Sequence, residues 1–87
     1  MSKPLQIEPA EGIHFLLRNI GEVTLHDVTI EKPSKGIPRK MPNNETLAPG
    51  QSVEFTLIRA HQSGWPGELM VSWHTQPTPV AIPMPSS

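Results

Sequence analysis

The stretch Leu47-Ala48-Pro49-Gly50-Gln51-Ser52-Val53-Glu54-Phe55-Thr56-Leu57 predicts a tight turn that leads directly into a β-strand. Proline followed by glycine is typical of such a turn, because proline presets the φ angle of the first central residue and glycine accepts a positive φ at the second. Apolar and polar residues then alternate from Val53 to Leu57, the period of a strand with one buried face. We therefore expect this turn and strand to organise the fold.

The chain has 87 residues, a length that favours a single domain over residues 1–87. It contains no cysteine, so neither a disulfide nor a cysteine-ligated zinc ion can support a small core. The net charge of −1 argues against a general nucleic-acid binder. The first residues show no signal-peptide pattern, and no apolar run is long enough for a transmembrane helix.

Alternating apolar residues predict a series of short strands with turns between them. They lie at Pro4–Glu8, Ile13–Asn19, Val23–Glu31, Val53–Arg59, Glu68–His74 and Val80–Met84, with a further short edge strand at Ile37–Met41. In this prediction residues 32–46 form a basic and polar loop and residues 83–87 a proline- and serine-rich tail. Six or seven strands without a helical stretch favour an all-β sandwich.

Two local irregularities carry structural information. The apolar parity changes between Leu25 and Val28, which predicts a β-bulge near His26 and Asp27. Near the C-terminus, four prolines share one parity and remove backbone donors from one side of the last strand: Pro77, Pro79, Pro83 and Pro85. That strand is therefore expected at a sheet edge that resists further strand pairing.

The inward-facing positions of these strands define the expected core. Its members are Ile7, Phe15, Leu17, Val23, Leu25, Val28, Ile30, Leu47, Val53, Phe55, Leu57, Leu69, Val71, Trp73, Val80 and Ile82. Ile13 is expected to point the same way as Phe15 and Leu17. Among the core side chains, Phe55 is the one whose loss is predicted to cost most.

Three motifs resemble those of bacterial immunoglobulin-like modules of the cell-adhesion-related type. They are Asn19-Ile20-Gly21, Leu25-His26-Asp27-Val28-Thr29-Ile30 and Leu47-Ala48-Pro49-Gly50-Gln51-Ser52, and the strand from Gly67 to Trp73 is also similar. The resemblance implies an immunoglobulin-like sandwich of mostly antiparallel strands. It implies no catalytic residues, because such modules act as spacers, adhesion units, accessory binding domains and decorations on phage particles.

Catalytic and cofactor chemistry finds little support in the residues. His14, His26, His61 and His74 lie on different strands or loops without close ligand spacing, so we expect no metal site and no cofactor. Cysteine is absent, and no Gly-x-Ser-x-Gly motif is present to hold a serine nucleophile. We therefore expect a protein that is not an enzyme.

Interaction surfaces are the stronger candidates. Leu16 and Ile58 are predicted to face outward on the same sheet and, if adjacent, to form a small apolar patch, although scattered surface apolar residues are normal. Lys32, Lys35, Arg39 and Lys40 form a basic run that is either a solvated loop or a contact with an acidic surface. Trp65 is either a lid on one end of the sandwich or a binding anchor.

The sequence thus favours a non-catalytic immunoglobulin-like module that decorates a larger assembly such as a phage virion. Its predicted docking residues are Leu16, Ile58, Lys35, Arg39, Lys40 and Trp65, and its expected partners are capsid or tail proteins, not nucleic acid or membrane. The expected location is the virion surface, or else the cytoplasm. The alternative is a carbohydrate- or cell-wall-binding accessory domain of a secreted protein that uses Trp65 and His61 as a sugar platform.

Overall fold

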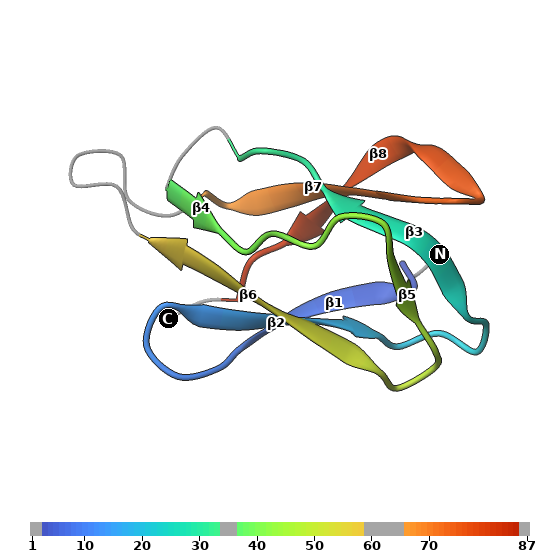
Figure 1. The fold of residues 1–87 in the computed structure, drawn as a ribbon, viewed down its shortest axis with the longest axis horizontal. Coiled ribbons are helices and arrows are strands. Elements are labelled where there is room, and N and C mark those ends of the chain that lie inside the picture. Colours follow the sequence, from blue (N-terminus) through green and yellow to red (C-terminus); the bar gives the residue numbers. More distant parts are fainter. Residues whose placement is uncertain (1–2, 34–36, 59–65, 86–87) are drawn as a thin grey trace.

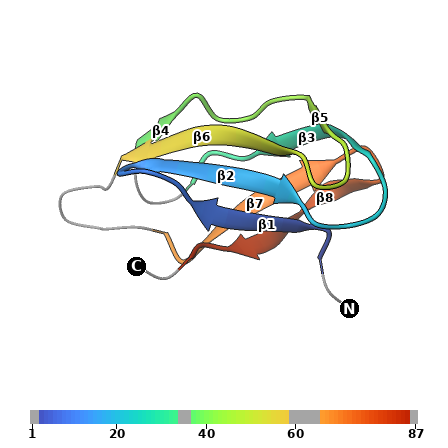
Figure 2. The same ribbon diagram turned by 90° about the horizontal axis from the view of Figure 1, so that it is seen from below.

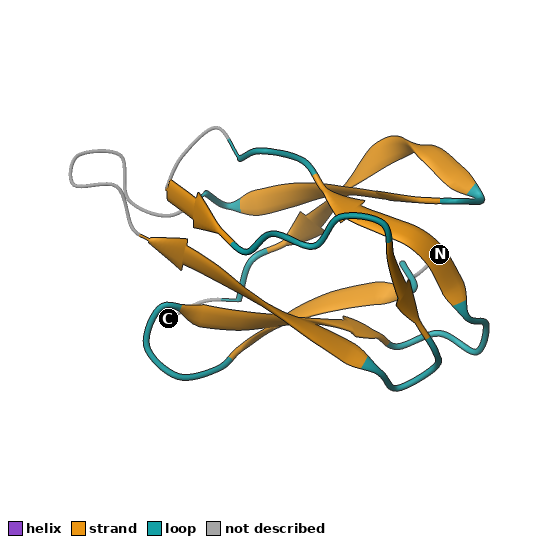
Figure 3. Cartoon of the chain, in the orientation of Figure 1, coloured by secondary structure: helices purple, strands orange, loops and turns teal. Residues whose placement is uncertain are grey.

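The protein is all-β over the residues that the structure describes. The computed structural model describes residues 3–33, 37–58 and 66–85, and these contain eight strands and no helix (Figure 3). The strands form two antiparallel four-stranded sheets that pack against each other (Figures 1 and 2). This arrangement is consistent with the predicted β-sandwich and contains more strands than the six or seven expected.

The first sheet has the strand order β1-β2-β6-β4. Its members are β1 (Leu5–Pro9), β2 (His14–Asn19), β6 (Ser52–Ile58) and the short β4 (Ile37–Arg39). The second sheet has the order β5-β3-β7-β8. Its members are β5 (Glu45–Leu47), β3 (Leu25–Ile30), β7 (Glu68–Trp73) and β8 (Gln76–Pro83). The predicted strand at Ile37–Met41 is therefore present as β4, whereas β5 lies in a segment expected to be loop.

The Pro-Gly turn forms as its sequence predicts. The amide of Gln51 donates to the carbonyl of Ala48 at 2.9 Å, and Gly50 has a φ of 82°. A positive φ at the second central residue after proline is the conformation of a type II turn. The Gly50 amide also donates to the carbonyl of Asn19 at 2.8 Å, so the turn is attached to the end of β2 as it leads into β6.

The bulge in β3 is confirmed. Leu25 pairs with Leu47 and Val28 with Glu45, so the register shifts by one residue between them. Asp27 is in the bulge and has a φ of 56°, a conformation that Asp tolerates better than most residues. Because of this bulge, both Leu25 and Val28 are buried although they lie three positions apart.

Most of the predicted core is buried between the sheets. Phe55 and Leu57 are fully buried, and Phe15 lies directly opposite Phe55 with ring centroids 5.7 Å apart. Val53 and Val80 are only partly buried, and Leu5 joins the core. Two expectations were wrong: Val23 is 71% exposed and Ile13 is 39% exposed. Both lie just outside the ends of β3 and β2, where side-chain alternation no longer directs them into the core.

Asn19 has a role that its turn motif did not reveal. Asn19 is not among the described residues with positive φ, so the motif does not use the tolerance of asparagine for left-handed geometry. Instead its side chain is fully buried, and its Nδ2 donates to the carbonyls of Val23 and Leu47, each at 2.8 Å. Its Oδ1 accepts the amide of Gly21 at 2.9 Å. The side chain therefore links the β2–β3 connection to β5.

Proline blocks two of the sheet edges. The Met84 amide donates to the carbonyl of Gly67, so the even-numbered residues of β8 make the backbone hydrogen bonds to β7. The backbone groups of the odd-numbered residues point away from β7. Pro79 and Pro83 thus remove donors from the open side of β8, as the parity of the prolines predicted. On β4, the backbone hydrogen bonds to β6 are made by Ile37 and Arg39. The backbone nitrogen of Pro38 therefore points to the open side of β4, where it removes a donor.

Candidate interaction surface

The outer face of the first sheet carries most of the described residues that the sequence predicted for docking. Residues directly opposite each other in an antiparallel pair share a face. The register of β6 with its two neighbours therefore places Ile37 beside Ile58, and Arg39, Thr56 and His14 in the next row. A third row holds Glu54, Leu16 and Glu8.

Leu16 and Ile58 lie on this common outer face but are not adjacent. Leu16 is opposite Glu54, and Ile58 lies four residues further along β6. At about 3.4 Å per residue, that separation is roughly 13 Å, beyond contact distance. Both side chains are half-buried. The apolar patch that would form if Leu16 and Ile58 were adjacent is therefore absent.

A different patch forms at the β4 end of the same face. Ile37 is 49% exposed and pairs directly with Ile58, while Arg39 is exposed one row away. We call Ile37, Ile58 and Arg39 the β4-end patch. Arg39 has no ion-pair partner among the described residues, so its charge is available to a ligand. Sequence reasoning overlooked Ile37, because only the register of β4 with β6 brings it beside Ile58.

The remaining predicted docking residues are only partly described. Lys40 follows β4 directly, is exposed, and has a φ of 52°. Lys32 is also exposed. Lys35, Trp65 and His61 lie outside the described residues. The basic character of the β4-end patch therefore comes from Arg39, with Lys40 next to it in the chain.

The middle of the face is polar and internally paired. His14 Nδ1 lies 3.0 Å from Thr56 Oγ1, and Thr56 is only 8% exposed. Leu16 lies between the carboxylate side chains of Glu54 and Glu8 in the neighbouring strands. This part of the face offers hydrogen-bonding groups and a half-buried leucine, and no continuous apolar area.

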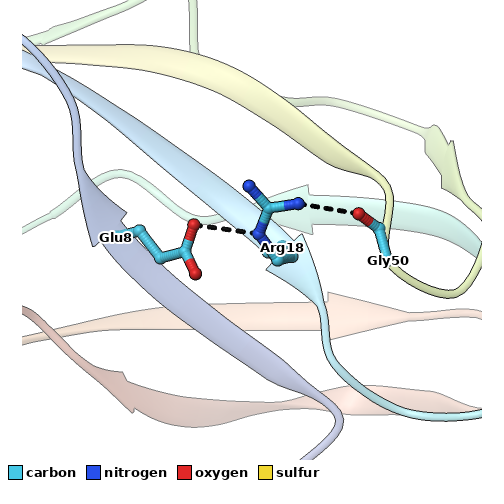
Figure 4. A network of polar contacts seen from close by, with 3 residues as sticks. All are labelled: Glu8, Arg18 and Gly50. Carbon is cyan, nitrogen blue, oxygen red and sulfur yellow. Dashed lines mark hydrogen bonds and ion pairs between the residues drawn. The ribbon is translucent and has the colours of Figure 1, made fainter.

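Arg18 connects three segments at the far end of the face. Its Nε donates to Glu8 Oε1 at 2.9 Å, and its Nη1 donates to the carbonyl of Gly50 at 2.7 Å (Figure 4). The guanidinium thus ties β1 and the Pro-Gly turn to β2. We assign Arg18 a structural role, because both of its neighbours belong to the scaffold.

The outer face of the second sheet is less suited to docking. Met70 is 38% exposed, and the pair His74–Asp27 has an Nδ1–Oδ2 distance of 3.7 Å with both side chains mostly in solvent. Within residues 3–33, 37–58 and 66–85, no three His, Cys, Asp or Glu side chains gather in a way that could hold a metal ion.

A cavity of about 290 Å³ opens at the end of the sandwich where β2 connects to β3. Pro4, Val23, Leu25 and Trp73 supply its apolar walls, and His26 and His74 also line it. Trp73 is 8% exposed, so most of its ring belongs to the core. Glu22, Thr24 and Thr75 also line the cavity.

Comparison of the chain with family models, with curated proteins and with solved structures finds no match. Among the described residues, no helix has the length and apolar character needed to cross a membrane.

Proposed function

We propose that this chain is a non-catalytic immunoglobulin-like module that docks on the protein surface of a larger assembly, a phage virion being the setting. The observation that carries the proposal is the β4-end patch, in which the exposed Ile37 and its neighbour Ile58 lie beside Arg39, which has no ion-pair partner in the described part of the chain. Arginine is enriched among the residues that contribute most binding energy at protein interfaces, and the core of an interface is more apolar than its rim.

The division of strands between the sheets supports the immunoglobulin-like assignment. In that fold the first, second, fourth and fifth strands form one sheet, and the third, sixth and seventh form the other. Here β1, β2, β4 and β6 share a sheet, and β3, β7 and β8 share the other. The extra strand β5 is only three residues long and adds to the free side of β3. The phage setting is supported by the motif resemblance.

The proposal is tested by a charge placed in the β4-end patch. A tagged chain is expressed in the organism that encodes it, and phage particles are purified on a density gradient. We expect the wild-type chain to band with the particles and the variant Ile58→Glu to be lost from them. The matched control is Met70→Glu, which places the same charge on the outer face of the second sheet and should leave binding unchanged.

Circular dichroism and thermal unfolding of both variants first establish that they fold. Absence of the wild-type chain from the particles would contradict the virion setting. Equal loss of Ile58→Glu and Met70→Glu would contradict docking through the β4-end patch. Retention of both variants would contradict it as well.

A further inference from the structure

The edge of β1 keeps more of its outward donors than the two edges that proline blocks, because the one proline of the strand, Pro9, is its last residue. Ile20 donates to the carbonyl of Pro4 at 2.8 Å and Ala10 donates to the carbonyl of His14 at 3.0 Å. These bonds lie at the two ends of a β1–β2 register without a shift, so the even-numbered residues of β1 make the backbone hydrogen bonds to β2. The backbone N–H and C=O groups of Leu5 and Ile7 therefore point away from β2, toward an edge on which no other strand of the described residues lies.

An apolar groove runs beside this free edge. It has a volume of about 470 Å³ and lies between β1 and β8, which follow the same side of the sandwich (Figure 2). Its walls are formed by Leu5, Ile7, Ile20, Ile82 and Pro83, with Lys3 at one end. The Lys3 ammonium donates to the carbonyl of Ala81 on β8, so a positive charge sits where β1 begins.

We propose that β1 accepts an added antiparallel strand from a partner protein, with apolar side chains at alternate positions and a carboxylate at its C-terminal end. The residues opposite Leu5 and Ile7 would direct both their backbone groups toward β1 and their side chains into the groove. Antiparallel pairing brings the C-terminal end of the added strand to Lys3, whose charge complements a carboxylate. This inference rests on the proposed function only in taking the partner to be a protein.

A second copy of the chain fits the groove less well. In a two-fold β1–β1 pairing, the side chains brought opposite Leu5 and Ile7 would be Leu5 and Ile7 of the other copy. These side chains are already in their own core, where each is only 3% exposed, so they cannot fill the groove of a neighbour. A strand from another protein has free side chains for this purpose.

The test uses a synthetic heptapeptide that alternates valine and threonine, with valine at both ends and a free C-terminal carboxylate. Amide hydrogen exchange of the full chain is followed by NMR while the peptide is added. We expect the Leu5 and Ile7 amides to exchange about tenfold more slowly at saturation, since each enters a backbone hydrogen bond. The amides of Gln6 and Glu8 already face β2 and should change little.

Two peptide controls isolate the backbone pairing. N-methylation of the valines removes the donors that would face β1 and should abolish the effect, while N-methylation of the threonines alters only the outer side. Lys3→Glu should weaken peptide binding by about three- to tenfold through charge reversal. Lys32→Glu makes the same change at an exposed site away from the groove and should not alter binding.

Unchanged exchange at Leu5 and Ile7 with millimolar peptide would overturn the proposal. Slowing of the same amides with chain concentration alone, together with dimers in sedimentation, would replace the partner strand by a second copy. Neither result bears on the β4-end patch, because β1 and β4 are at opposite edges of the first sheet. Failure of strand addition and failure of particle docking are therefore separable.

Discussion

At the scale of single residues, Asn19 shows how one buried amide can join segments that belong to different sheets. Its Nδ2 supplies two donors to the carbonyls of Val23 and Leu47, and its Oδ1 accepts the amide of Gly21. Gly21 also lies close to Pro4, since a Cβ added there would approach the Pro4 Cβ to 3.2 Å. The Asn-x-Gly motif thus combines a buried amide with a close backbone approach.

Asn19→Asp should destabilise the protein by roughly 3–5 kcal/mol at neutral pH. The substitution keeps the shape of the side chain but places carboxylate oxygen against two carbonyl oxygens in a fully buried site. The free energy of unfolding from urea titration measures the loss. Asn43→Asp, at an exposed position, should change stability by no more than about 0.5 kcal/mol. Similar losses in the two variants would contradict the role assigned to Asn19.

Gly50→Ala should destabilise the protein by about 1–2 kcal/mol, because an L-residue is strained at a φ of 82°. Space is not the obstacle, since a Cβ at Gly50 would meet no atom within 4 Å. Gly67→Ala is the matched control: its Cβ also has open space, and its φ is not in the left-handed range. Thermal unfolding should show a lower midpoint for Gly50→Ala alone. An unchanged midpoint would mean that the turn is not type II.

At the scale of elements, β6 is central because it pairs with β2 on one side and β4 on the other. Phe55→Ala should cost about 3–5 kcal/mol, since the ring is fully buried and stacked on Phe15. Denaturant titration provides the measurement. Glu54→Ala on the same strand removes an exposed side chain and should cost little. A loss below about 1 kcal/mol for Phe55→Ala would contradict the placement of β6 in the core.

The edge of β8 permits a prediction about association. Pro79→Thr combined with Pro83→Thr restores two outward backbone donors to an edge strand, and we expect self-association that grows with concentration. Sedimentation velocity should detect it. Pro49→Thr makes the same chemical change in the exposed turn and should leave the association state of the chain as it is in the wild type. A monomeric double variant would show that the prolines do not protect this edge.

At the scale of the whole molecule, the two sheets share one core, and we expect them to unfold together. Leu17 and Phe55 from the first sheet and Val71 and Ile82 from the second are all fully buried in the same cluster. In the variant Trp65→Phe, the fluorescence of Trp73 should report only on the core. Its urea transition should coincide with that of far-ultraviolet circular dichroism, as two-state unfolding requires. Two separate midpoints would indicate that the sheets unfold independently.

Local chemistry made much of the fold predictable. The Pro-Gly turn, the alternation in β6 and β7, the bulge at Asp27 and the proline-protected edge each depend on residues that are neighbours in the chain. The exposure of Val23 and Ile13 could not be predicted in this way, because the alternating pattern of the sequence continues past the point where each strand ends. The three-residue strand β5 also escaped it, since so short a segment shows no measurable period.

The sequence by itself therefore determined the all-β class, the turns and which residues of the longer strands face inward, because backbone preferences and side-chain period act locally. Only the tertiary structure decided that Ile37 lies beside Ile58 while Leu16 lies apart from it, since that depends on strand register. It also decided that Asn19 reaches Leu47 and that Leu5 and Ile7 face a free edge beside a groove. Such contacts join residues that are distant in the chain, and packing of the two sheets brings them together.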